Sequence, residues 1–146
     1  MNLTVQQNCV AEIQFRSTSV YPDPYNDVDL EVVFRGPQGE SMRVPAFWAG
    51  DNVWAARFAG EHAGKYEFHS ECSDNGDTGL HARSGTVTVV SYIGVNPLYM
   101  HGRLRVAADK RHFVQADGTP FFWVGDTWWM GLTLSLIHIS EPTRPY

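Results

Sequence analysis

The sequence predicts a mainly β protein, in which an antiparallel β-sandwich is followed by a hairpin and by a strand of a different kind. Three observations lead to this prediction. Between residues 3 and 90, apolar and polar residues alternate in short runs, and clusters rich in Gly, Pro, Asn and Asp separate these runs. Beyond them, a continuous apolar run replaces the alternation. The two patterns indicate strands that are buried on one face and on both faces, respectively.

The alternating runs define the expected core. Further β-rich runs cover residues 53–58, 65–70 and 86–90, and a weaker run covers 42–47, in which Pro45 marks an edge strand or a bulge. Six or seven short strands separated by such turns are typical of an antiparallel sandwich. The residues expected on one buried face are Cys9, Ala11, Ile13 and Phe15 in the first run, and Val28, Leu30, Val32 and Phe34 in the second.

Size and charge exclude several classes of protein. The chain has 146 residues, enough for one ordinary domain, whereas a complete α/β barrel needs about 250. With 11 Lys and Arg against 16 Asp and Glu, a broad basic face for nucleic acid is not expected. No apolar run approaches the ~20 residues that span a bilayer, so no membrane partner is expected. The start MNLTVQQNCV lacks the pattern of a signal peptide, which favours the cytoplasm.

The two cysteines, Cys9 and Cys72, are too few for a disulfide-built scaffold. A single bridge across the core is one option, because an immunoglobulin-like sandwich often joins two strands in this way with a Trp nearby, and Trp48 and Trp54 lie between the cysteines. The alternative is two reduced thiols. Without a signal peptide, we expect the cysteines to be unbridged.

The character of the sequence changes near Ser91. The run LRVAA, a turn at Asp109–Lys110 and the run HFVQ predict a hairpin, and a second turn, ADGTP, leads into the apolar run Phe121–Val124. Such a run is typical of a strand buried on both faces, as in a parallel barrel or a doubly wound sheet. Thr127 is a suitable N-cap for a helix after this strand.

Asp126 follows the apolar run, and alternation places it on the same face as Phe122 and Val124. In parallel α/β architectures ligands bind at the carboxyl ends of strands, so the Asp126 carboxylate would accept hydrogen bonds from sugar hydroxyls or take part in proton transfer. The alternative is that Asp126 only caps the following helix. Trp128 and Trp129 offer flat faces for a sugar ring, although such residues more often pack a helix on a sheet.

No metal ion or cofactor is expected. The six His match no zinc pattern, and no phosphate-binding loop is present. Acidic residues in the sandwich half are more simply solvated turn residues than calcium ligands. These residues are Asp23, Asp27, Asp29 and Glu31.

The last residues are set apart from the fold prediction. The segment Leu134–Arg144, LSLIHISEPTR, resembles the translation of a transposase-end adapter used for sequencing libraries. We therefore expect natural sequence to end near Thr133, and segments of this kind are excluded from fold reasoning.

The segment RHFVQADGTPFFWVGDTWW resembles the opening of the apiosidase-like glycoside hydrolases, with its aromatic-rich hairpin, DGTPFF-like turn and GDT-W segment at the first barrel strand. The preceding part is similar to the immunoglobulin-like β-sandwich that often precedes that barrel. It shares a PAFW segment, a W-x-x-RF strand, a Gly-Lys-Tyr-x-Phe strand and a GLH turn. The resemblance covers nearly all of residues 1–133.

This resemblance implies a (β/α)8-barrel hydrolase that uses two carboxylic acids on complex glycans, plant glycans among them. Both acids are expected on later barrel strands, so no catalytic residue is assigned, and the fragment itself is expected to be inactive. The expected organisation is a sandwich accessory domain (1–92), a linker (93–103), the start of the barrel (104–133) and an adapter-derived tail (134–146). The alternative function is that of a carbohydrate-binding or purely structural sandwich.

Overall fold

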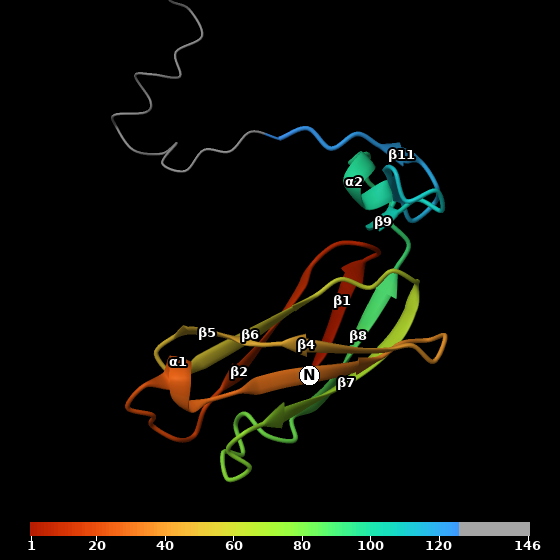
Figure 1. Ribbon diagram of the computed structural model, residues 1–146. Helices are drawn as coiled ribbons and strands as arrows, with labels where there is room; N and C mark the ends of the chain where they lie inside the picture. Colours follow the sequence, from red (N-terminus) through yellow and green to blue (C-terminus); the bar gives the residue numbers. More distant parts are fainter. Residues whose placement is uncertain (126–146) are drawn as a thin grey trace, which may run out of the picture.

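The structure is a computed structural model, and it describes residues 1–125. Two sheets pack face to face, and a small third sheet follows beyond one end of them (Figure 1). The first sheet has the order β1 (Asn2–Gln6), β8 (Ser84–Val90), β7 (Gly64–Cys72), β3 (Leu30–Arg35) and β4 (Ser41–Pro45). The second has the order β2 (Ala11–Arg16), β6 (Val53–Phe58) and β5 (Phe47–Gly50).

The mainly β fold and the sandwich are confirmed. The strand order is immunoglobulin-like, because β2, β6 and β5 correspond to strands B, E and D, and β8, β7, β3 and β4 to strands G, F, C and C′. One pair departs from the expected antiparallel arrangement: β1 runs parallel to β8, with Leu3 opposite Val87. A parallel pair needs a long connection between its strands, and here the rest of the sandwich supplies it.

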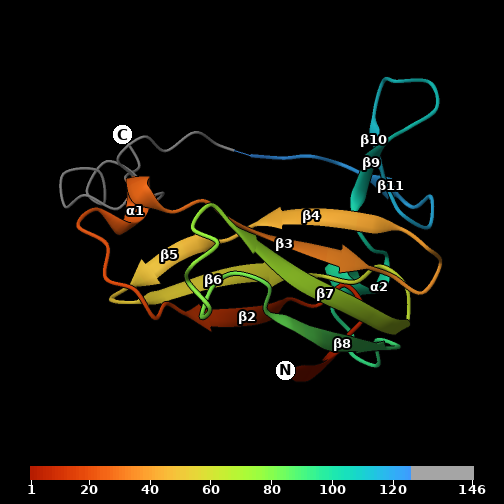
Figure 2. The same cartoon turned by 90° about the horizontal axis from the view of Figure 1, so that it is seen from below.

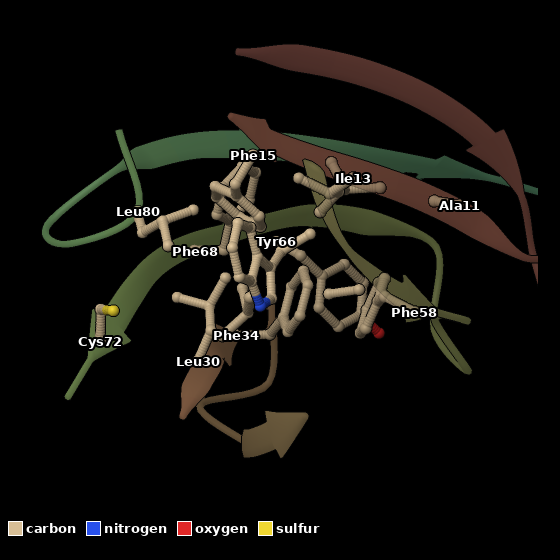
Figure 3. Packing of buried hydrophobic residues seen from close by; sticks show 14 of the residues in the cluster. Ala11, Ile13, Phe15, Leu30, Phe34, Phe58, Tyr66, Phe68, Cys72 and Leu80 are labelled. Carbon is tan, nitrogen blue, oxygen red and sulfur yellow. The ribbon is translucent and has the colours of Figure 1, made fainter. Parts of the chain in front are cut away.

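The core lies between the two sheets and is rich in aromatic rings (Figure 3). The Phe34 and Phe58 rings stack with centroids 4.1 Å apart, and Phe15 meets Phe68 edge-on at 6.4 Å. In β2 only the alternate residues are buried, as the period-two pattern predicts. The expected core residues Ala11, Ile13, Phe15, Val28, Leu30, Val32 and Phe34 are all buried, whereas Cys9 is only half-buried.

The weak run at 42–47 divides between the two sheets. Its first part forms β4, which ends at Pro45 on the edge of the larger sheet, and β5 begins at Phe47 on the edge of the smaller one. Pro45 therefore marks an edge strand, one of the two options that the sequence left open. The chain crosses between the sheets at Ala46. This crossover leaves one end of the sandwich open beside the single-turn helix α1 (Pro24–Asp27).

The cysteines are unbridged, as expected: Cys72 is buried at the end of β7, and Cys9 is half-buried before β2. Burial raises the pKa of the Cys72 thiol. The buried thiol therefore behaves as a small apolar core residue.

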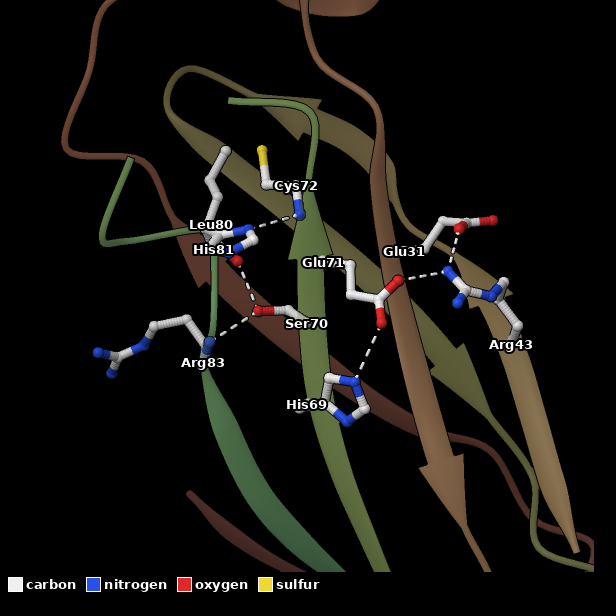
Figure 4. A network of polar contacts seen from close by, with 9 residues as sticks. All are labelled: Glu31, Arg43, His69, Ser70, Glu71, Cys72, Leu80, His81 and Arg83. Atoms are coloured by element: carbon white, nitrogen blue, oxygen red, sulfur yellow. Dashed lines mark hydrogen bonds and ion pairs between the residues drawn. The ribbon is translucent and has the colours of Figure 1, made fainter. Parts of the chain in front are cut away.

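The loop between β7 and β8 is held down by polar side chains. The Ser70 hydroxyl donates to the Leu80 carbonyl at 2.5 Å and accepts from the Arg83 N–H at 2.9 Å, and the Cys72 N–H donates to His81 Nδ1 (Figure 4). These bonds satisfy backbone groups that a loop would otherwise leave unpaired. The loop therefore folds back over the end of β7 instead of projecting into solvent.

The third sheet has the order β11 (Pro120–Phe121), β10 (Phe113–Gln115) and β9 (Leu104–Val106), and both of its pairs are antiparallel. The expected hairpin is therefore present, and it continues into a third short strand. Between the sandwich and this sheet lies one more helical turn, α2 (Pro97–Met100). Within the described residues, no helix is long and apolar enough to cross a membrane.

Candidate functional site

The residues proposed to bind substrate, Asp126, Trp128 and Trp129, lie outside the described residues. The structure describes the segment that leads to them. Only Phe121 of the apolar run 121–124 is in a strand, and Phe122 and Val124 are largely exposed. In the described part of the chain β11 has a partner, β10, on one side only. A strand that is buried on both faces needs a layer of structure packed on each side of its sheet, and the described residues supply none here, so the predicted doubly buried strand at 121–124 is not present in them.

Aromatic rings gather at the end of this segment. Trp123 contacts Phe121 edge-on at 6.4 Å between centroids, and its ring lies 5.4 Å from that of Phe113 on β10. Alternation predicts that residues 121 and 123 share a face, and their contact agrees with this. The aromatic cluster of Phe113, Phe121 and Trp123 therefore immediately precedes the predicted sugar-binding residues along the chain.

The turn between β10 and β11 is built from its own sequence. Gly118 has a φ of +88°, a conformation that other residues rarely adopt. Asp117 Oδ1 accepts from the Thr119 N–H at 2.9 Å, and the Gly118 N–H donates to the Gln115 carbonyl at 2.9 Å. The prediction of a turn at ADGTP is thus confirmed, and Asp117 supplies the side-chain hydrogen bond that closes such a turn.

Asp117 also pairs with His101, which follows α2. His101 Nδ1 lies 2.6 Å from Asp117 Oδ2. This hydrogen bond, with the backbone N–H of Thr119, lowers the pKa of Asp117 to about 2. The pair ties the connector to the turn of the small sheet. The sequence did not indicate the contact between His101 and Asp117, because the two residues are 16 positions apart.

A second polar contact fixes the small sheet on the sandwich. Glu61, in the turn between β6 and β7, accepts from Arg103 at 3.1 Å on one carboxylate oxygen and from Arg105 at 2.5 Å on the other. The Asn8 side chain, in the turn between β1 and β2, donates to the Tyr99 carbonyl at 2.8 Å. These contacts join segments more than forty residues apart, so sequence analysis missed them. They set the direction in which the chain leaves the sandwich.

Two family models match this arrangement in the order that the structure shows. Residues 4–73 match the family described as Domain of unknown function (DUF5060), and residues 107–138 match the apiosidase-like catalytic domain. Over the second of these segments, the chain is similar to the apiosidase-like glycoside hydrolases. The apiosidase-like match includes Asp126, Trp128 and Trp129, and it ends inside the segment 134–146. No curated protein matches the sequence.

A solved structure supports the same relation. The crystal structure of a "putative glycoside hydrolase" from Bacteroides vulgatus ATCC 8482 superposes with a TM-score of 0.67 and 26% sequence identity, over 82% of this chain. The match covers 21% of the Bacteroides chain, so the present chain spans about a fifth of that protein.

Proposed function

We propose that this chain is the accessory sandwich and the opening segment of the catalytic domain of a glycoside hydrolase that acts on complex glycans. One observation carries the proposal: the apiosidase-like catalytic match begins at residue 107, directly behind an immunoglobulin-like sandwich. The superposition on the Bacteroides vulgatus protein, over 82% of this chain, supports this order of domains. The boundaries 1–92, 93–103 and 104–133 are part of the proposal.

In this proposal Asp126, Trp128 and Trp129 contribute to the sugar-binding mouth of the complete barrel. The carboxyl ends of barrel strands form the binding face of such folds, and these residues follow the first barrel strand. The Asp126 carboxylate accepts hydrogen bonds from sugar hydroxyls, and an indole face stacks on a sugar ring. The aromatic cluster of Phe113, Phe121 and Trp123 is covered by the rest of the barrel.

The 146-residue polypeptide is proposed to be inactive by itself. Glycoside hydrolysis uses a pair of carboxyl groups, about 5–10 Å apart, and one of them needs a raised pKa to act as an acid. Glu31 and Glu71 in the sandwich are close together, since both bond to Arg43 Nη1, at 2.5 and 2.6 Å. However, the hydrogen bond from Arg43 lowers the pKa of Glu71, which is opposite to the requirement for a general acid.

The test compares this polypeptide with the protein encoded by the longest reading frame that contains the sequence of residues 1–133. Both are incubated with a panel of aryl glycosides and plant polysaccharides, and released sugar is measured. The longer protein should release sugar and the 146-residue chain should not. In the longer protein, Asp126→Asn should raise KM more than it lowers kcat, because the residue is proposed to bind hydroxyls.

Two results would contradict the proposal. One is reproducible turnover by the 146-residue chain that is lost in Glu71→Gln. The other is a folded longer protein that acts on no glycoside or polysaccharide of the panel.

A further inference from the structure

A groove of about 670 Å³ opens at the end of the sandwich where α1, the start of β3 and the β4–β5 crossover meet. Figures 1 and 2 both place α1 and β5 at the opposite end of the sandwich from β9 and β11. The chain therefore leaves the sandwich, toward the proposed catalytic domain, at the end that lies far from this groove. The groove therefore lies far from the small sheet of β9, β10 and β11.

Aromatic side chains form one part of the groove. Tyr25 on α1 is 76% exposed and Trp48 on β5 is 41% exposed. Neither ring is buried in the core, so their aromatic faces are available to a ligand. The Trp48 indole N–H donates to the Asp51 carbonyl at 3.0 Å, and Trp48 lies opposite the buried Trp54 in the strand register. The exposed indole is therefore held in place before any ligand arrives, which lowers the entropic cost of binding.

Carboxylates line another part of the groove, at Asp29, Glu31 and Glu71. Arg43 bonds to both glutamates, which fixes their positions and offsets part of their charge, as Figure 4 shows. Carboxylate oxygens accept hydrogen bonds and donate none, so they suit a ligand that presents hydroxyl groups. The acidic lining disfavours uronic-acid polymers and nucleic acids, because like charges repel.

The ligand that fits both parts has an apolar face, an edge of hydroxyl groups and no negative charge. A neutral sugar ring has these properties, and a volume of about 670 Å³ accommodates several linked rings. We propose that this groove binds a neutral oligosaccharide, which stacks on Trp48 and Tyr25 and donates hydroxyl hydrogen bonds to Asp29 and Glu71. A cationic peptide is the competing occupant, because Arg43 offsets one of the three carboxylate charges, and the tetralysine titration described below distinguishes it from a sugar.

The experiment titrates the full 146-residue chain with cellohexaose, xylohexaose and mannohexaose, and follows both heat and tryptophan fluorescence. Tetragalacturonate and tetralysine serve as the acidic and the cationic probes. We expect saturable binding of at least one neutral hexasaccharide. Trp48→Ala and Tyr25→Ala should each weaken this binding about tenfold, the effect of losing one stacked ring. Trp123→Ala, which removes an exposed indole outside the groove, should leave it unchanged.

Tyr25 is the more exposed of the two residues, so Tyr25→Ala keeps the test valid if Trp48→Ala destabilises the fold. The proposal is overturned if no neutral hexasaccharide binds, if binding survives in both groove variants, or if tetragalacturonate or tetralysine binds more tightly. The proposed hydrolase relation does not depend on this groove. A negative titration would therefore leave the comparison of the short and long proteins unaffected.

Discussion

Asp77 offers the sharpest test of how the sandwich is held together. Its side chain is fully buried in the loop between β7 and β8. The carboxylate accepts from the backbone N–H groups of Thr18 and Gly79, at 3.0 and 2.9 Å, and from the hydroxyls of Ser17, Thr18 and Tyr21. Asp77 therefore joins this loop to the segment that follows β2.

The expected cost of Asp77→Ala follows from these partners. The hydroxyls can rotate to other acceptors; that of Ser17, for example, lies 2.6 Å from the Ser19 carbonyl. The two backbone N–H groups are fixed, and an unpaired buried donor costs about 1–3 kcal/mol. We expect Asp77→Ala to lower the free energy of unfolding by about 4 kcal/mol, a large part of the ~5–15 kcal/mol typical of a domain.

The assay is urea unfolding followed by tryptophan fluorescence and circular dichroism. Asp74→Asn is the matched control, because Asp74 lies in the same loop but is only half-buried and accepts from the Gly76 N–H and Tyr21. The control should cost less than about 1 kcal/mol. A loss below about 1 kcal/mol for Asp77→Ala would refute the reasoning, since it would mean that the N–H groups find other partners.

The pH dependence gives an independent check. Burial by itself raises the pKa of Asp77, but the hydrogen bonds from Ser17, Thr18 and Tyr21 outweigh it and hold the pKa well below its ordinary value. The carboxylate therefore contributes stability above its unfolded pKa of about 3.9, and this contribution is lost as the pH falls toward the native pKa. The stability difference between the wild type and Asp77→Asn should be constant from about pH 7 to 5 and should shrink below about pH 4. A difference that grew on acidification would contradict the assignment.

Three further predictions concern the small sheet and the thiols. Glu61→Gln should speed hydrogen exchange in β9–β11 but not in β7, because it weakens the contacts with both Arg103 and Arg105. The control Glu67→Gln, at an exposed residue, should change exchange in neither region, and unchanged exchange in β9–β11 of Glu61→Gln would show that Glu61 does not hold the small sheet. His101→Gln should raise the pKa of Asp117 from about 2 toward 3.9 in a carboxyl NMR titration. The stability that the ionised Asp117 adds above about pH 4 should shrink accordingly, because it depends on the difference between the unfolded and native pKa values, and an unshifted titration would exclude the pair. Both cysteines should react with a thiol reagent under denaturing, non-reducing conditions, and finding no reactive thiol would show that they are bridged.

The local pattern of the sequence was enough to predict most of the strands and the turn between β10 and β11, although it did not single out β1 or most of β5. Alternation placed Ile13 and Phe15 on the buried face because side chains in a strand point alternately to its two sides. Gly118 and Asp117 predicted their turn because each favours a particular local backbone conformation. The family resemblance rests on similar short segments. These features depend on residues close together in the chain, and for that reason they can be read from it.

Other features depend on which distant segments meet. The parallel pairing of β1 with β8 and the crossing of the chain at Ala46 follow from packing two sheets around one core, and neither has a local signature. Asp77 was not singled out, because a buried carboxylate and a solvated one look alike until the donors from Ser17 and Thr18 are in place.

The groove and the contacts of Glu61 have the same origin. Trp48 and Tyr25 become neighbours only when β5 packs beside α1, and Glu61 meets Arg105 only when the small sheet docks on the sandwich. The sequence by itself determined most of the strand segments, the inward faces of the alternating ones, and the turn between β10 and β11, since short-range sterics and alternation govern these. The tertiary structure alone decided the strand order and the polar contacts of Asp77 and Glu61, because these arise between residues tens of positions apart.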